Sequence, residues 1–169
     1  MRPIYAYGRF VVLESGDFFQ MIIYEYLDIA EELASAVSSG LQEELESMKE
    51  NMQSFLDKEV VKVNDVVVRP SIQLVDVGFR GSLKRPFVEF LIHFKGDLTE
   101  GVNTYENVYE PEVATYDYSV SWVLPLGFRV VEAVLGVDYT VGPPNVLRFK
   151  VVKGFRTPGY ERIRFHRSV

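Results

Sequence analysis

An amphipathic stretch of about thirty residues, 28–57, constrains the fold more than any other feature of this sequence. With successive residues placed about 100° apart, as in an α-helix, its apolar side chains fall on one face. That face comprises Leu33, Ala34, Val37, Leu41, Leu45, Met48, Met52 and Phe55. Asp28 and Glu31 have the spacing of a capping box, which predicts that the helix begins there.

Gly40, preceded by two serines, interrupts the good helix formers of this stretch. A glycine costs roughly 1 kcal/mol relative to alanine inside a helix. Because the apolar face keeps its phase across Gly40, we expect at most a kink. At about 1.5 Å per residue the helix would be a rod of about 45 Å, whereas a compact chain of this length has a radius of gyration of roughly 15 Å. We therefore predict that the helix crosses the whole domain.

Runs of β-branched and aromatic residues precede and follow the helix. Before it, residues 4–13 and 18–27 flank a turn-forming segment and predict a hairpin. Residues 60–63 and 66–68 flank Asn64 and Asp65, which fits either a tight hairpin or one irregular strand. Further strands are predicted at residues 71–80, 87–95, 102–109, 113–124, 128–141, 146–153 and 160–167.

Eight strands at about 4.8 Å each would form a flat sheet nearly 40 Å wide, whereas a helix is about 10 to 12 Å across. One helix cannot cover such a sheet, yet residues 18–23 and 130–135 are apolar on both faces. The sheet must therefore curl around the helix or bury its second face in a partner subunit, and we favour curling. The predicted fold is α+β: one long helix packed in a curled, mostly antiparallel sheet of about seven to nine strands, ordered as β-hairpin, helix and β-meander. Residues 1–169 form one domain, with residues 154–169 a candidate peripheral basic tail.

The composition excludes several classes of site. The chain has no cysteine and two histidines, so it carries no disulfide framework, thiolate nucleophile or histidine cluster. No glycine-rich phosphate loop occurs, and we expect no metal and no cofactor. The N-terminus lacks a signal core and no apolar run reaches about 20 residues, which predicts a soluble, cytoplasmic protein without a membrane partner. Few Asn and Gln residues favour a heat-adapted source.

The element order resembles the hot-dog arrangement, a long helix wrapped by an antiparallel sheet. That resemblance implies an acyl-thioester enzyme with an acidic residue near the N-terminus of the helix, where Asp28, Glu31 and Glu32 could supply the carboxylate. The chain departs from the pattern in two ways: one branch's Asp-x-Asn-x-His signature is absent, and a hairpin precedes the helix. Fold alone does not establish an activity.

The charges are segregated along the chain. Residues 148–169 carry seven Lys and Arg against Glu161 alone, a net charge of +6, so the remainder carries −12. Aromatic residues interleave with these cations, which indicates a surface for single-stranded nucleic acid or another polyanion. The alternative is a pair of edge strands protected by charge. The candidate polyanion-binding residues are Arg148, Lys150, Lys153, Arg156, Arg162, Arg164 and Arg167.

Residues 96–117 hold six acidic residues and no Lys or Arg. This acidic segment could meet the basic tail of a neighbouring subunit, which would make assembly sensitive to salt. Carboxylates also suit calcium or magnesium, but the segment lacks EF-hand spacing, so solvated hairpin charges are the better interpretation. His93, between Glu89 and Lys95, could act as a general acid or base, although a surface histidine is the simpler interpretation.

A set of aromatic residues falls on strands that we expect to be adjacent. These residues either line a ligand crevice, with hydroxyl groups as polar contacts, or pack as cross-strand pairs. The candidate crevice residues are Tyr105, Tyr109, Tyr116, Tyr118, Trp122 and Tyr139.

The absence of a catalytic constellation favours a binding or assembly module that is non-enzymatic and homo-oligomeric, with a crevice between helix and sheet. Two alternatives stay open, namely a nucleic-acid or polyanion binder and a hot-dog-like enzyme.

Overall fold

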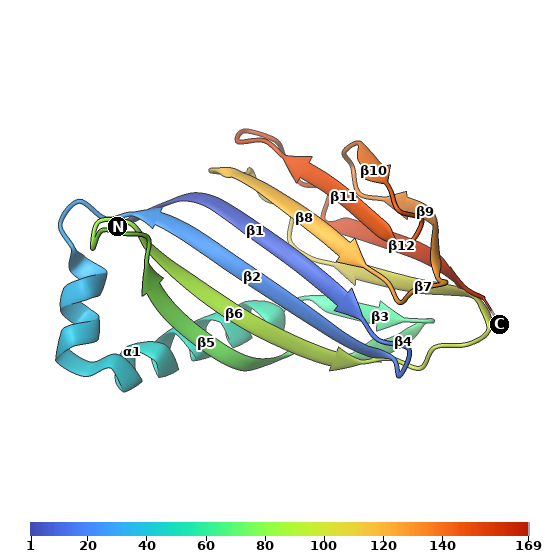
Figure 1. The fold of residues 1–169 in the computed structure, drawn as a ribbon, viewed down its shortest axis with the longest axis horizontal. Helices are drawn as coiled ribbons and strands as arrows, with labels where there is room; N and C mark the ends of the chain where they lie inside the picture. The colour runs from blue at the N-terminus through green and yellow to red at the C-terminus, as the bar shows by residue number, and fades with distance from the viewer. Residues whose placement is uncertain (169) are drawn as a thin grey trace.

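The computed structural model describes residues 1–168, which form one helix and twelve strands (Figure 1). The elements are β1 (Arg2–Val12), β2 (Asp17–Leu27), α1 (Glu32–Leu56), β3 (Val60–Val63), β4 (Val66–Val68), β5 (Ser71–Phe79), β6 (Pro86–Lys95), β7 (Gly101–Val108), β8 (Asp117–Val123), β9 (Arg129–Val134), β10 (Tyr139–Val141), β11 (Val146–Val151) and β12 (Tyr160–Arg167). Within residues 1–168, no helix is long and apolar enough to cross a bilayer.

The strands form two sheets whose inner faces pack together. The larger sheet has seven strands in the order β10-β11-β8-β1-β2-β6-β5, and the smaller has five in the order β4-β3-β7-β12-β9. Every strand pair is antiparallel except β1 with β8, which is parallel. The α+β class and the antiparallel pairing are confirmed. The expected single curled sheet is instead two open sheets, with twelve strands in place of the predicted seven to nine.

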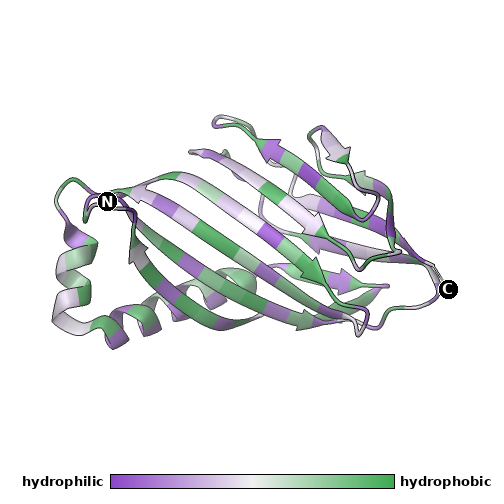
Figure 2. Ribbon diagram, viewed as in Figure 1, coloured by the Kyte–Doolittle hydropathy of each residue, from purple (hydrophilic) through white to green (hydrophobic). Residues whose placement is uncertain are grey.

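Hydrophilic and hydrophobic residues intermix along the strands (Figure 2). Successive side chains of a strand point to opposite faces, so one face of each strand can be apolar. In β6, Val88, Phe90, Ile92 and Phe94 are buried while the residues between them are partly exposed. The inner face is covered in two parts. The five-stranded sheet covers β1, β8 and β11 together with Phe18 of β2 and Phe94 of β6, and the helix covers β5 and the rest of β6.

Each cover forms its own hydrophobic core. The inter-sheet core is aromatic: Trp122 stacks on Phe10 with ring centroids 4.0 Å apart, and Tyr105 lies 4.6 Å from Trp122. The helix-covered core joins Leu33 and Leu56 of α1 to buried residues of β5 and β6, with Met48 and Met52 packed at its edge.

The helix differs from the predicted straight rod. It bends sharply at Gly40, whose φ of −178° and ψ of 73° are not helical, so α1 follows the end and then the inner face of the larger sheet. The bend also shifts the apolar face. Leu41 and Phe55 are exposed, and Leu56 takes the buried place expected for Phe55.

The start of the helix also differs from the expected capping box. Glu31 has a left-handed backbone conformation and makes no side-chain cap hydrogen bond. Asp28 is fully buried, and its Oδ2 accepts a hydrogen bond of 2.9 Å from the backbone N–H of Leu33. That bond, together with the Glu32 N–H and the N-terminal ammonium group, holds the pKa of Asp28 below its usual range.

The strands settle one question that the sequence left open and correct two predictions. Asn64 and Asp65 both have positive φ, so β3 and β4 form a tight hairpin. Residues 128–141 form two strands in different sheets rather than one. The candidate peripheral tail, residues 154–169, contains β12, which lies between β7 and β9 and buries Ile163 and Phe165 completely within the described residues.

Candidate functional site between the sheets

The structure divides the aromatic residues that the sequence singled out. Tyr105 and Trp122 are 1% exposed and belong to the inter-sheet core, so they pack rather than line a crevice. Tyr139 lies on the edge strand β10, and its hydroxyl group accepts a 3.3 Å hydrogen bond from the backbone N–H of Ala133. Tyr109, Tyr116 and Tyr118 are partly exposed.

These three tyrosines gather at one end of the sandwich, where β2 and β7 end and β8 and β12 begin. Tyr118 of β8 is separated from Tyr24 of β2 only by Ala6 of β1, which pairs with both. Burial raises the pKa of Tyr24, and the neighbouring charge of Tyr116 adds to the rise. Burial and then Tyr109 raise the pKa of Tyr118 in the same way. The rings therefore form one group against the inner face.

Polar side chains of the smaller sheet point into the same region. In β7, Asn107 lies opposite Glu161 of β12 and Val61 of β3, and these three residues share the inner face. Asn107 donates a hydrogen bond of 2.9 Å from Nδ2 to Oε2 of Glu59. The Tyr105 hydroxyl group donates one of 3.3 Å to Oε1 of Glu161. We call Glu59, Asn107 and Glu161 the acceptor cluster.

The electrostatics of the acceptor cluster are those of carboxyl groups without a counter-ion. Burial raises the pKa of Glu161 from 4.5 to about 7, with a further contribution from the charge of Glu59, while the Tyr105 hydroxyl opposes the rise. Burial also raises the pKa of Glu59, against the donation from Asn107. Within residues 1–168, neither carboxylate forms a salt bridge with a Lys or Arg.

One acceptor of the cluster also lacks a hydrogen-bond donor. Asn107 is 8% exposed, and its buried Oδ1 has no hydrogen-bond partner among the described residues. A buried acceptor left unpaired costs about 1–3 kcal/mol. Glu59 and Glu161 are partly exposed, so solvent reaches the cluster. No group of three acidic or histidine side chains that could hold a metal ion occurs within residues 1–168. The chemistry that fits is a ligand that donates N–H groups.

The predicted basic surface is divided between two sheets. Arg148 and Lys150 lie on β11 of the larger sheet, whereas Arg162 and Arg164 lie on β12 of the smaller sheet. Both arginines of β12 bind Glu132 of β9, at 2.8 and 3.1 Å. Neither β11 nor β12 is an edge strand, which rules out the edge-protection interpretation.

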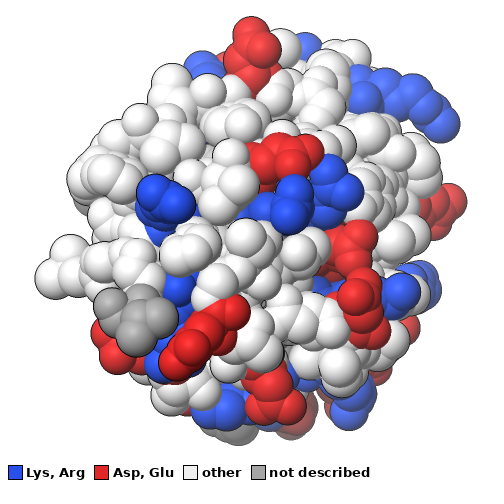
Figure 3. All heavy atoms as spheres, turned by 90° about the vertical axis from the view of Figure 1, so that its right-hand side faces the viewer, with Lys and Arg blue, Asp and Glu red and all other residues white. Residues whose placement is uncertain are grey.

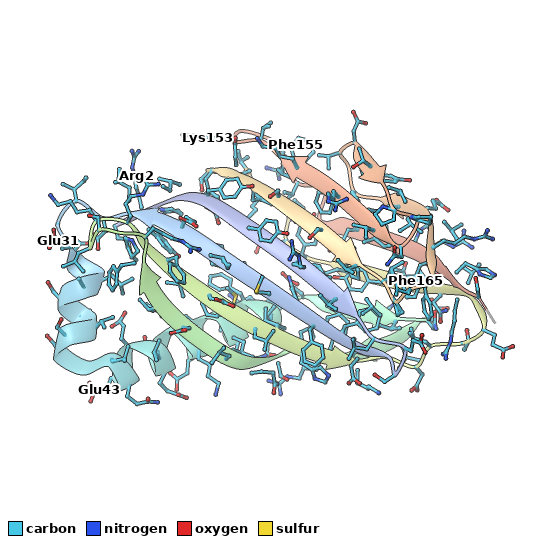
Figure 4. All side chains as sticks on the ribbon, in the orientation of Figure 1. Arg2, Glu31, Glu43, Lys153, Phe155 and Phe165 are labelled. Carbon is cyan, nitrogen blue, oxygen red and sulfur yellow. The ribbon has the colours of Figure 1, made fainter. Side chains whose placement is uncertain are left out.

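The other members of the basic segment lie apart from these strands. Lys153 is in the connection after β11, and in Figure 4 it lies at the top of the view while Phe165 lies toward the right. Arg156 is exposed, and Arg167 lies over the Phe128 ring at 5.8 Å. Acidic and basic side chains alternate over the end of the molecule seen in Figure 3.

The remaining candidate residues are engaged within the chain. His93 Nε2 lies 2.8 Å from Oδ1 of Asp17, which also contacts Lys95. In the acidic segment, Asp117 pairs with Lys150 at 3.5 Å. Asp28, a carboxylate implied by the hot-dog resemblance, is used to cap the helix.

Sequence reasoning missed the acceptor cluster itself. Glu161 was visible as the single acid of the basic segment, and it alternates with Ile163 and Phe165, which are fully buried. This alternation in the sequence could have predicted an acidic side chain on the inward face of the strand. Glu59 and Asn107 lie on segments whose pairing only the structure shows.

Comparisons with known proteins give no family. No protein-family model matches the sequence, and no curated protein matches it. Among solved structures, the chain is similar to the crystal structure of an aminopeptidase N family protein from Idiomarina loihiensis, with a TM-score of 0.37 and 9% sequence identity. The match covers 94% of this chain and 29% of that protein.

Proposed function

We propose that this protein is a non-enzymatic binding module that takes a small organic cation at the acceptor cluster. The observation that carries this proposal is the unpaired Oδ1 of Asn107, buried beside two carboxyl groups that have no cationic partner in the described chain. An ammonium or guanidinium group supplies the donors and the charge that this set lacks.

The tyrosines support the same class of ligand. Tyr24, Tyr109 and Tyr118 place aromatic rings beside the acceptor cluster, and aromatic faces attract cations by about 0.5–2 kcal/mol. A bound cation also favours the charged form of Glu161, which burial disfavours in the free protein. Binding is therefore expected to tighten as pH rises through about 7. The groups that face Glu161 are the Tyr105 hydroxyl, Glu59, Tyr109 and Tyr118.

The test is calorimetric titration with butylamine, butylguanidine and choline, with butanol as the neutral control. We expect the three cations to bind and butanol not to bind. Glu161→Gln keeps the shape and removes the charge, and it should weaken binding at least tenfold. Glu106→Gln is the matched control, because Glu106 lies next to Asn107 on the outer face and contacts Tyr160 instead. Equal binding of butanol, or an unchanged affinity in Glu161→Gln, would refute the proposal.

The expected homo-oligomer stays a prediction. Its best support is the outer face of the larger sheet, where Met21 of β2 and Leu91 of β6 pair directly and are partly exposed. Light scattering at low and high salt measures it, with a stable dimer at both salts expected. A monomer under both conditions would remove the assembly part of the prediction.

A further inference from the structure

A groove of about 420 Å³ lies on the larger sheet, away from the acceptor cluster. It is lined by residues of β1, β8, β10 and β11 and by Asp138, which precedes β10. Ser119 and Ser121 of β8 line it, and their hydroxyl groups contact those of Tyr5 and Tyr7. The acceptor cluster uses none of these residues, so the groove is a separate feature of the fold.

Strand register builds two polar rows across this groove. In one row Ser119 lies between Tyr7 of β1 and Lys150 of β11. In the next, Ser121 lies between Arg9 of β1 and Arg148 of β11. Residues two apart on one strand point to the same face and are about 7 Å apart, while neighbouring strands are about 4.8 Å apart. The three cations therefore converge on the two serines from both sides.

Contacts within the chain hold the two guanidinium groups in place. Arg9 donates from Nε to the Ser121 hydroxyl group at 3.2 Å, donates to the Tyr7 hydroxyl group, and lies over the Tyr7 ring at 5.2 Å. Arg148 donates from Nη1 to the carbonyl oxygen of Gly142 at 2.8 Å. A guanidinium group has five N–H donors, so each arginine is positioned while donors remain for a ligand.

The charge balance limits what the groove can take. Arg148, Lys150 and Asp138 line the groove, and Arg9 adjoins it through Ser121. Lys150 lies 3.5 Å from Asp117, so three cations have two acids beside them. A surplus of about one charge suits a single phosphate or sulfate group better than a long polyanion, which would meet both acids. Hydroxyl groups and arginine donors are the usual ligands of such oxyanions.

We propose that this groove is an oxyanion site, in which Arg9, Arg148 and Lys150 bind one phosphate or sulfate group over Ser119 and Ser121. Arg148 and Lys150 belong to the basic segment that indicated a polyanion surface. The proposed ligand of these two residues is therefore one small anion rather than a long polyanion.

The test is titration of the full chain at low salt with inorganic phosphate, inorganic sulfate, adenosine monophosphate and a short single-stranded oligonucleotide. Free phosphate or sulfate binding as tightly as the nucleotide identifies the free ion, and tighter nucleotide binding identifies a phosphate ester. Arg148→Gln should weaken binding at least fivefold. Arg156→Gln, the same charge change at an exposed position outside the groove, should leave it unchanged.

Two results would overturn the site. No binding of any of the small anions at millimolar concentration removes it, as does equal weakening by Arg148→Gln and Arg156→Gln, which would indicate a general charge effect. The oligonucleotide could instead bind at least a hundredfold tighter than the nucleotide, with an affinity whose salt dependence corresponds to several neutralised phosphates. That result would indicate a nucleic-acid surface and not an oxyanion site. Far-UV circular dichroism checks that both variants fold.

Discussion

The two covers of the larger sheet's inner face differ in how completely they exclude water. Among the largest side chains of residues 1–168 that are less than 2% exposed, nine apolar ones lie in the inter-sheet core and only Ile92 belongs to the helix-covered core. A sheet that packs face to face on another sheet covers a broad area of it, whereas a helix covers only a narrow stripe. The helix-covered half is therefore the looser half.

The acceptor cluster lies where these two covers meet. Glu59 follows the end of α1, Asn107 and Glu161 belong to the smaller sheet, and Tyr24 packs edge-on against Phe90 of the helix-covered core at 6.0 Å. Glu59 and Glu161 are partly exposed at this boundary, so these polar groups are within reach of solvent. The difference between the two cores thus positions the candidate site.

Trp122→Ala should have the largest effect on stability. Trp122 is 1% exposed and stacks on Phe10 inside the inter-sheet core. Truncating a buried tryptophan leaves a cavity and typically costs about 3–5 kcal/mol. Urea denaturation followed by circular dichroism measures the free energy of unfolding. A loss below about 1 kcal/mol would show that this core is not the tighter one.

Leu56→Ala tests the helix-covered core and should cost less, roughly 2–3 kcal/mol. Leu56 is 8% exposed, and the side chains around it are only partly buried. Its neighbour Phe55 is 65% exposed and provides the matched control. Phe55→Ala should change the free energy of unfolding by less than about 0.5 kcal/mol. If the two variants lose equal stability, the assignment of the inward face is wrong.

The pH dependence of the free energy of unfolding tests the state of Glu161, which lies at the boundary between the two covers. Because its pKa is about 7 in the folded chain and ordinarily 4.5, the folded state binds more protons between these values. Stability is therefore highest below about pH 4.5 as far as this group is concerned, and falls by roughly 2–3 kcal/mol as pH rises to about 7. Glu161→Gln should remove this fall and be the more stable protein at pH 8. If the free energies of unfolding of the two proteins change with pH in parallel, the raised pKa of Glu161 is contradicted.

Periodicity in the sequence predicted most elements but not their assembly. The alternation in β6 and the long apolar face of α1 identify a strand and a helix, since both are local patterns. The pairing of β1 with β8 joins residues more than a hundred positions apart, and the same patterns fit one curled sheet or two stacked sheets. The expected width of the sheet showed that one helix could not cover it. That width does not show that the chain supplies the second cover itself.

The candidate sites were predicted less well for a related reason. Tyr109, Tyr116 and Tyr118 lie close in sequence and at one end of the sandwich, and their part in a ligand crevice stays a prediction. Asn107 and Glu59 become a site only through the β3 and β7 pairing, and Arg9 meets Arg148 only through β8. Residue type alone does not distinguish a buried carboxyl from a solvated one.

Gly40→Ala probes the smallest difference, namely whether the bend of α1 comes from its glycine or from its packing. Leu33 and Val37 before the bend and Met48 and Met52 after it contact the same core, so packing on both sides of Gly40 supports the bend. The φ of −178° is extended backbone that alanine adopts, and an added Cβ would meet only Glu43 Oε2 at an ordinary 3.5 Å.

We therefore expect Gly40→Ala to keep the bend and to stabilise the chain by about 0.4–1 kcal/mol, because alanine restricts the unfolded state. Far-UV circular dichroism should show no gain of helix, and urea denaturation should give the small increase in stability. A larger helical signal together with lower stability would mean that the glycine sets the bend. In that case the loose helix-covered core follows from one residue rather than from the way a helix covers a sheet.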